Sequence, residues 1–169
     1  MKKIISVAGL CFVLASCGFQ PMYGGYSDAS GQEQYVRSQL TQIHIENIPD
    51  REGQFLRNAL IDRFYRDARA SDPLYRLKIS SITESIVDLD ITKESDTTRS
   101  QLRVTTSMNL IDTQTGESVL GRKLSAISSF NVLGSEFATR VSEKNTRENA
   151  LNELARQIEL QIGLYLRRQ

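Results

Sequence analysis

Cysteine and histidine are scarce in this chain of 169 residues, which holds two cysteines and a single histidine, His44. The sequence also lacks a glycine-rich phosphate loop and a cluster of residues with metal-ligand spacing. A Ser/His/Asp triad would depend on His44, which lies in an alternating, strand-like stretch where a surface histidine is the commoner role. The sequence therefore predicts a protein that is not an enzyme and that carries no metal and no cofactor.

The chain also lacks a strong charge of either sign and a long hydrophobic run. It has 21 Lys and Arg against 20 Asp and Glu, so no bulk field attracts it to nucleic acid, and we expect no nucleic-acid partner. The apolar stretch at its start, Ile4 to Leu14, spans about eleven residues, whereas a membrane-spanning helix needs roughly twenty. This stretch is therefore too short to be a transmembrane helix.

The apolar stretch is instead typical of a secretory signal that ends in a lipobox. Lys2 and Lys3 precede it, and Leu14-Ala15-Ser16-Cys17 closes it with small residues before a cysteine. We predict that residues 1–16 are a signal peptide and that Cys17 becomes the acylated first residue of the mature chain, with palmitate as the expected amide-linked chain. The competing interpretation, a buried thiol behind a core helix, is disfavoured by the extreme N-terminal position and the flanking lysines.

Cleavage before Cys17 bounds the mature protein. Cys11 is lost and Cys17 is used for lipid, so the mature chain has no disulfide and packing must stabilise it. Residues 17–40 begin with a stretch rich in Gly, Ser and Gln and are predicted to be the acylated Cys and a tether, and residues 41–169 a single α+β periplasmic domain. Gly18 stands where an Asp favours retention in the inner membrane, so the similarity to bacterial lipoproteins implies the cell outer membrane, on its periplasmic side.

Hydrophobic periodicity predicts four strands and two helices in this domain. Apolar and polar residues alternate over residues 42–48, 74–91, 102–110 and 120–130. In the second of these strands the alternation slips near Ser80 and Ser81, which indicates a bulge. Helical spacing covers residues 50–66 and the end of the chain up to Tyr165, although the polar residues 142–149 leave the start of the last helix unclear.

The predicted order is strand, helix, three strands, helix, and each strand has one apolar face. A sheet buried on both faces would read as continuous Val, Ile and Leu. We therefore expect an α+β fold, with a four-stranded mixed sheet, two helices packed on one face and an N-terminal lipid tether. The other face, rich in Ser, Thr and Arg, is predicted to stay polar, which fits plain solvent as well as the interior of another structure.

The first residues after the signal resemble the start of a known family. The lipobox is followed by Gly18-Phe19-Gln20-Pro21-Met22-Tyr23-Gly24, which is similar to the Cys-Gly-Phe-x-Pro-hydrophobic-Tyr start of the lipopolysaccharide-assembly lipoprotein family, called LptE or rare lipoprotein B. The predicted order of strands and helices also fits this family. The resemblance implies an outer-membrane component of lipopolysaccharide export that plugs the β-barrel translocon LptD, assists its assembly and binds lipopolysaccharide.

A second interpretation stays open, namely a lipoprotein adaptor of another outer-membrane or lipid-transport machine. Such an adaptor would share the lipobox and the α+β pattern but not the run from Gly18 to Gly24. A barrel lumen is polar, so a polar sheet face and a permanent tether suit the first interpretation. Copurification of a large β-barrel protein distinguishes the two.

Lipid A carries phosphates, and phosphate recognition favours Arg and Lys on a rigid scaffold because a guanidinium can bind in bidentate geometry. Lys93, Arg99 and Arg103 surround the turn between the second and third predicted strands and are expected to converge at one tip of the sheet. Arg122 and Lys123 are neighbours on a strand and should point to opposite faces. The first three residues are therefore the predicted lipopolysaccharide site, with ordinary solubilising charges as the alternative.

Overall fold

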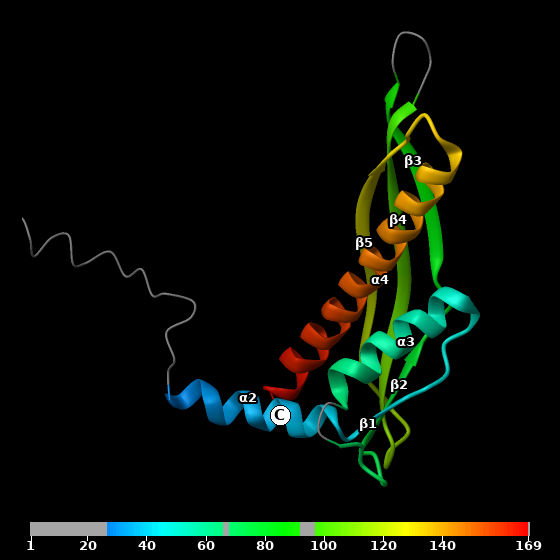
Figure 1. Cartoon of the computed structure of the whole chain (residues 1–169). Helices are drawn as coiled ribbons and strands as arrows, with labels where there is room; N and C mark the ends of the chain where they lie inside the picture. Colours follow the sequence, from blue (N-terminus) through cyan, green and yellow to red (C-terminus); the bar gives the residue numbers. More distant parts are fainter. Residues whose placement is uncertain (1–26, 66–67, 92–96, 169) are drawn as a thin grey trace, which may run out of the picture. The chain divides into compact units, whose positions relative to one another are not determined.

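The computed structural model describes residues 27–65, 68–91 and 97–168. The chain divides into two units, Met1–Glu33 and Gln34–Gln169, and each is considered by itself. Of the first unit, the described residues are the opening turns of a helix, and the second unit holds the sheet and the helices that cover it (Figure 1). Cys17 and Lys93 lie outside the described residues, so their roles stay predictions.

Three helices and five strands make up the described chain, against the two helices and four strands that periodicity predicted. The α+β class and the mixed sheet are as expected. In chain order the elements are α2 (Ser27–Leu40), β1 (Ile43–Ile45), α3 (Asp50–Phe64), β2 (Tyr75–Ile79), β3 (Thr83–Ile91), β4 (Thr97–Asp112), β5 (Ser118–Asn131) and α4 (Glu136–Leu166).

Strand β4, with 16 residues, is the strand on which the sheet is built. It pairs antiparallel with β5 along one edge, and with both β2 and β3 along the other. The short strand β1 adds to β2 in parallel. The β4–β5 hairpin turns through residues 113–117, where Gly116 has a φ of 74°, a left-handed conformation that favours glycine.

The stretch predicted as one long strand, residues 74–91, is two strands in the structure, which corrects the expected strand count. Ile79 lies opposite Met108 and Thr83 lies opposite Thr105, so this side advances four residues while β4 advances three. One extra residue reverses the alternation of faces, as a bulge does. The irregular alternation near Ser80 and Ser81 therefore reflects a real change of face, but it marks the end of one strand and the start of another.

Hydroxyl groups satisfy the backbone where β2 gives way to β3. Thr106 Oγ1 donates to the carbonyl oxygen of Ser80 over 2.8 Å, and the Ser107 N–H donates to Ser80 Oγ over 3.0 Å. Thr106 is buried, and a buried polar group without a partner is costly. These hydrogen bonds therefore make the interruption of the ladder tolerable.

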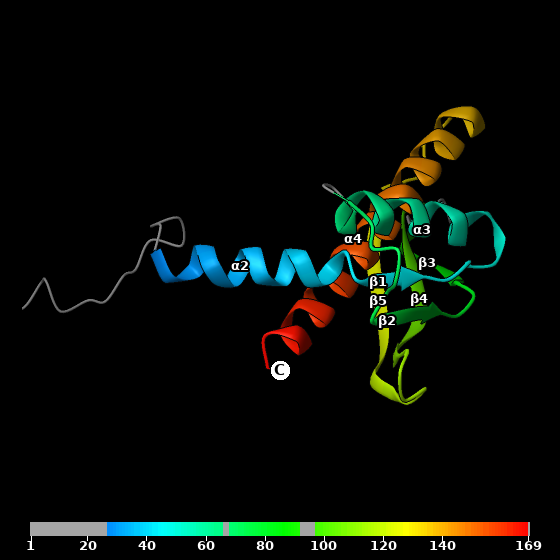
Figure 2. The ribbon, with the colours of Figure 1, turned by 90° about the horizontal axis from the view of Figure 1, so that it is seen from below.

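The core lies between the sheet and the helices α3 and α4. Helix α4 packs across β5 and β4, and α3 packs against α4 and β1, so the two helices lie on the same side of the sheet, as predicted (Figure 2). Alternate residues of β4 point toward them. The fully buried side chains include Ile43, Ile45, Leu56, Leu60, Leu77, Leu102, Met108, Leu110, Leu151, Leu154 and Ile158.

The third helix, α2, falls within the residues predicted to form a tether. Its last turns are part of the core, because Val36 and Leu40 are buried there. A methyl group on Gly163 of α4 would lie 3.6 Å from Val36 Cγ1, which shows how closely the two helices approach. The polar composition around these two apolar residues hid the helix from periodicity analysis.

Helix α4 begins at Glu136 and has 31 residues, so it includes the polar stretch 142–149 that obscured its start in the sequence. Ser135 precedes it and accepts a hydrogen bond from the Ala138 N–H. Ion pairs one turn apart stabilise the polar stretch, as between Glu143 and Arg147 at 2.7 Å. None of the described helices, α4 included, combines the length and the apolar character needed to cross a membrane.

Candidate functional site

Cations gather on the sheet face that the helices leave open. On β4, and on β5 from Leu120 onward, this face is formed by the odd-numbered residues, and on β2 by the even-numbered ones, because strand residues alternate between faces. Five exposed cations lie there, and we call them the basic face: Arg76, Lys78, Arg99, Arg103 and Lys123. Their sequence neighbours on the same strands mostly point into the core.

Two acidic residues adjoin the basic face, Glu46 beside β1 and Asp90 of β3, which lies opposite Arg99 in the strand pairing. Among the described side chains, one ion pair involves these five cations: Glu46 Oε1 lies 3.2 Å from Arg76 Nε. The residues between the cations on β4 are neutral and polar, namely Gln101, Thr105, Ser107 and Asn109. The face therefore presents guanidinium and ammonium groups to an anionic ligand within a field of hydrogen-bonding side chains.

Two of the three predicted site residues, Arg99 and Arg103, are described and share this face. They stand four residues apart on β4, which corresponds to about 13 Å along the strand. Arg99 lies opposite Asn131 of β5, near the start of β4, and Arg103 lies opposite Ile127. The structure thus brings Arg99 and Arg103 to one surface, and the convergence with Lys93 stays a prediction.

The other members of the basic face were not predicted as site residues. The alternation in the sequence already placed Arg76 and Lys78 on the outer side of their strand, but it could not show that β2 lies beside β4. Arg122 and Lys123 point to opposite faces, as predicted, since they pair with the buried Met108 and with Ser107. Lys123 therefore joins the basic face, and Arg122 points to the helix side.

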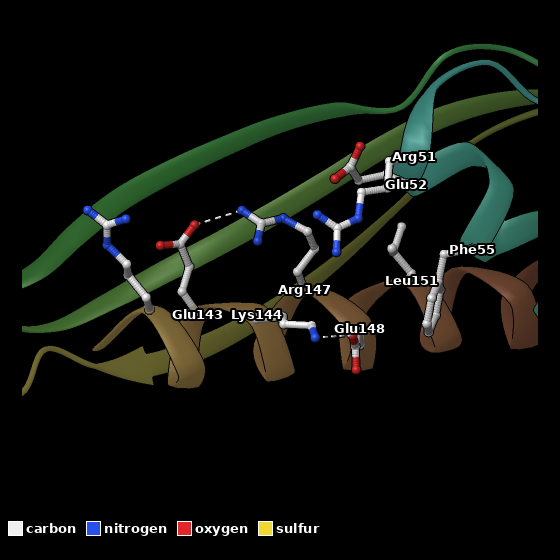
Figure 3. A pocket seen from close by; sticks show the side chains of 9 residues that line it. Arg51, Glu52, Phe55, Glu143, Lys144, Arg147, Glu148 and Leu151 are labelled. Atoms are coloured by element: carbon white, nitrogen blue, oxygen red, sulfur yellow. Dashed lines mark hydrogen bonds and ion pairs between the residues drawn. The ribbon is translucent and has the colours of Figure 1, made fainter. Parts of the chain in front are cut away.

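A hollow of about 630 Å³ lies on the helix side, between the first turn of α3 and the N-terminal half of α4 (Figure 3). Its lining has four cations and three carboxylates over an apolar floor: Arg51, Glu52, Phe55, Arg140, Glu143, Lys144, Arg147, Glu148 and Leu151. Opposite charges are paired within it, as between Lys144 and Glu148. This balance makes the hollow a weaker anion site than the basic face.

Arg147 in this hollow ties β3 to α4. Its Nε donates to both carboxylate oxygens of Glu84 on β3, over 2.9 and 3.0 Å, and its Nη2 donates to Glu143 over 2.7 Å. Burial by itself would lower the pKa of Arg147, but the hydrogen bonds and charges of Glu143 and Glu84 outweigh it and raise the pKa. The Arg147 guanidinium therefore links helix α4 to the edge strand β3.

His44 lies in β1, half-buried, on the open side of the sheet. Its Nδ1 contacts the Arg69 guanidinium, and that guanidinium also lies 5.4 Å from the centre of the Tyr65 ring. Over residues 27–65, 68–91 and 97–168 no group of three His, Cys, Asp or Glu side chains is placed to hold a metal ion. His44, Arg69 and Tyr65 thus form a cluster of side chains in contact with one another.

The fold is shared with lipoproteins of known structure. A lipoprotein from Caulobacter crescentus CB15 matches with a TM-score of 0.61 and 23% identity, over 80% of this chain and 98% of its own. A minor lipoprotein from Acinetobacter baumannii matches with a TM-score of 0.54 and 22% identity, over 72% of this chain and 90% of its own. The rare lipoprotein B from Shewanella oneidensis matches with a TM-score of 0.54 and 9% identity, over 69% and 87%. At these identities the likeness shows the fold alone.

The family of this chain is shown by its sequence, whereas the solved structures show only its fold. No curated protein sequence matches the chain. The family model of LptE, described as lipopolysaccharide-assembly, matches residues 40–163, which covers most of the chain and nearly all of the unit that holds the sheet. The resemblance seen in residues 14–24 lies outside that span and points to the same family. The chain belongs to the LptE family of lipopolysaccharide-assembly lipoproteins.

Proposed function

We propose that this protein is an outer-membrane lipoprotein of lipopolysaccharide export. It is anchored by acylated Cys17, occupies the lumen of the β-barrel LptD, assists the assembly of that barrel, and presents its basic face to lipopolysaccharide. The family match supports the assembly role. The observation that carries the binding role is the group of five exposed cations on the open side of the sheet, which outnumber the two acidic residues beside them.

The chemistry of the ligand suits this surface. Lipid A phosphates are anionic, and a guanidinium offers two parallel donors to a phosphate. Arg99 and Arg103 project from β4, which is paired on both edges, so the sheet holds their backbone rigidly. A scaffold that does not rearrange loses less entropy when it binds. The protein would act by holding and orienting lipopolysaccharide, without a chemical reaction.

An open polar face also suits the proposed place of the protein. The lumen of a large barrel is polar, so the open side of the sheet needs no further helix to cover it. A soluble domain in bulk solvent could have such a face as well. Copurification decides between them: the acylated protein, extracted in mild detergent, should bring a large β-barrel partner with it, and recovery of a different machine would support an adaptor.

The binding role is tested with purified lipopolysaccharide. Replacing Lys93, Arg99 and Arg103 by Gln should weaken binding and flatten its dependence on salt, because screened charge interactions are lost. The matched control replaces Arg51, Arg140 and Lys144 by Gln, which removes the same charge from the hollow between α3 and α4. Equal binding by the first variant and the wild type at low ionic strength would rule the site out.

The anchor is tested at Cys17. Cys17→Ser removes the proposed acyl acceptor, so cells labelled with a radioactive fatty acid should show no incorporation into the variant, and the protein should leave the outer-membrane fraction. The wild type serves as the control in the same cells. Undiminished labelling of the variant would end the lipoprotein assignment.

A further inference from the structure

A second hollow lies on the helix side of the sheet, between the start of β5 and the last turns of α4. It has a volume of about 270 Å³ and is lined by Ser118, Val119, Leu120, Gly121, Arg122, Gln161, Leu164, Tyr165 and Arg168. Among these residues the charged ones are Arg122 and Arg168, and both are exposed. In contrast to the hollow between α3 and α4, no carboxylate offsets the arginines in this lining.

Exposed apolar side chains lie on α4, which lines this hollow, and on α2, which approaches the same turns of α4. Leu160 and Leu164, one turn apart on α4, are 49% and 41% exposed, and Tyr35 of α2 is 48% exposed. Gly163 lies between the two leucines in sequence and approaches Val36, the neighbour of Tyr35. We call Tyr35, Arg122, Leu160, Leu164 and Arg168 the base surface. Its pairing of apolar residues with cations is typical of segments that rest on an anionic membrane.

The base surface is separate from the predicted lipopolysaccharide site. Arg122 pairs with Met108 and Arg99 pairs with Asn131, so they are nine residues apart along β5 and β4, or about 30 Å, and Arg122 points to the other side of the sheet. Variants at one surface can therefore be made without touching the other.

We propose that the base surface rests on a bilayer that contains anionic phospholipid, with a headgroup phosphate held between Arg122 and Arg168. Leu160, Leu164 and Tyr35 enter the interfacial layer beside it. The inference rests on the proposed function in the acylated Cys17, and it places this end of the sheet-bearing unit outside the barrel lumen, beside the membrane. Residues 34–40 join the core next to this surface, so the chain that leads back to Cys17 departs from the same end of the sheet-bearing unit.

A membrane fits this surface better than a second copy of the chain. Arg37 and Arg167 are also exposed and belong to the same ends of α2 and α4, so two copies would bring like charges together. The attraction of anionic lipid phosphates to this surface, in contrast, increases with every added cation. Tyrosine is also common at membrane interfaces, because its ring is apolar and its hydroxyl is polar.

The test uses the whole mature chain with Cys17→Ser, so that inserted lipid does not hide weaker contacts. It should sediment with vesicles that contain phosphatidylglycerol and stay in solution with vesicles of phosphatidylcholine. An arginine near an anionic membrane strengthens binding about five-fold, so Arg122→Gln with Arg168→Gln should weaken it roughly 25-fold. The control pair, Lys123→Gln with Arg103→Gln, removes equal charge from the opposite sheet face and should leave binding within about two-fold.

Several results would overturn the inference. Equal weakening by both pairs would mean that net charge alone governs binding, and equal sedimentation with both kinds of vesicle would remove the role of anionic lipid. Competition by millimolar inorganic phosphate would indicate a site for a soluble anion instead of a bilayer. Each variant must keep the circular dichroism and urea midpoint of the parent, so loss of folding cannot imitate loss of binding.

A parallel assay separates this inference from the proposed function. Arg122→Gln with Arg168→Gln should still bind purified lipopolysaccharide, whereas the Lys93, Arg99 and Arg103 variant should still bind phosphatidylglycerol vesicles. In the acylated protein, amide hydrogen exchange across residues 160–168 should slow in phosphatidylglycerol nanodiscs relative to phosphatidylcholine nanodiscs. Unchanged exchange would contradict the membrane contact even if lipopolysaccharide binding is confirmed.

Discussion

Gly53 and Gly163 are both helical glycines, and they differ in what a side chain would meet. A Cβ on Gly53 would lie 2.7 Å from Ile48 Cγ2 and 3.1 Å from the Ile48 backbone, whereas one on Gly163 would meet Val36 at an ordinary 3.6 Å. Gly53→Ala should therefore destabilise by about 1–3 kcal/mol. Gly163→Ala should stabilise by about 0.5–1 kcal/mol, since alanine favours the helix. Urea unfolding of both variants checks this, and shifts of the same sign would contradict it.

Glu153 on α4 should make stability depend on pH in the acid range. Hydrogen bonds from Arg156 and then Gln157 lower its pKa from 4.5 to about 2. A lowered pKa in the folded state gives stability that is present above the unfolded pKa and is lost as pH falls through the folded one. The advantage of wild type over Glu153→Gln should thus be full above pH 4.5 and fade toward pH 2.

Urea midpoints of the two proteins at several pH values measure that difference. The side chain is 38% exposed, so solvent screens the interaction and we expect a small effect. Arg156→Gln provides the control, because it removes the main partner and should leave the same flattened profile. A difference between wild type and Glu153→Gln that persists unchanged at pH 2 would refute the assignment.

Among the elements, the junction of β2 and β3 depends on one buried hydroxyl. Thr106→Val keeps the shape of the side chain but removes the donor to the Ser80 carbonyl. The unpaired group should cost about 1–3 kcal/mol of unfolding free energy. Thr105→Val, on the open face of the same strand, is the matched control and should be nearly neutral. Equal effects of the two substitutions would show that the hydroxyl bond does not stabilise the junction.

The elements also show how far sequence patterns reach. Alternation predicted β4 well, because a strand paired on both edges with one buried face has the cleanest period. It missed α2, whose contribution to the core rests on Val36 and Leu40 within a polar segment. It left the start of α4 uncertain, because residues 142–149 are held by ion pairs, which create no apolar stripe.

The candidate site was predictable only in part for a related reason. Alternation alone could place Arg99 and Arg103 on one face and separate Arg122 from Lys123. It could not show which strands are neighbours, since β4 adjoins β2 across a gap of many residues. Arg76, Lys78 and the hollow that contains Arg168 all depend on such long-range pairings. Residues that come together only through long-range strand pairing therefore cannot be recognised as one site from the sequence alone.

The whole mature molecule should depend on packing alone for its stability. Cys17 is the only cysteine after residue 16, and the described part of the chain offers no cluster of metal ligands. Thermal unfolding should be the same with and without chelator, and with and without dithiothreitol. A shift of several degrees with either reagent would contradict this prediction and reveal a bound metal or a disulfide.

Strand β4 also dictates when the fold can form. Synthesis proceeds from the N-terminus, and until residues 97–112 have been made, β2 and β3 have no antiparallel partner. Once they exist, the hairpin with β5 is a local contact and should form early, with the earlier strands added to its free edge. Until then Ile86, Val87 and Leu89, exposed even in the folded state, have no neighbouring strand. A fragment that ends before Thr97 should therefore stay without a paired sheet and should be cleaved by proteases faster than the whole chain.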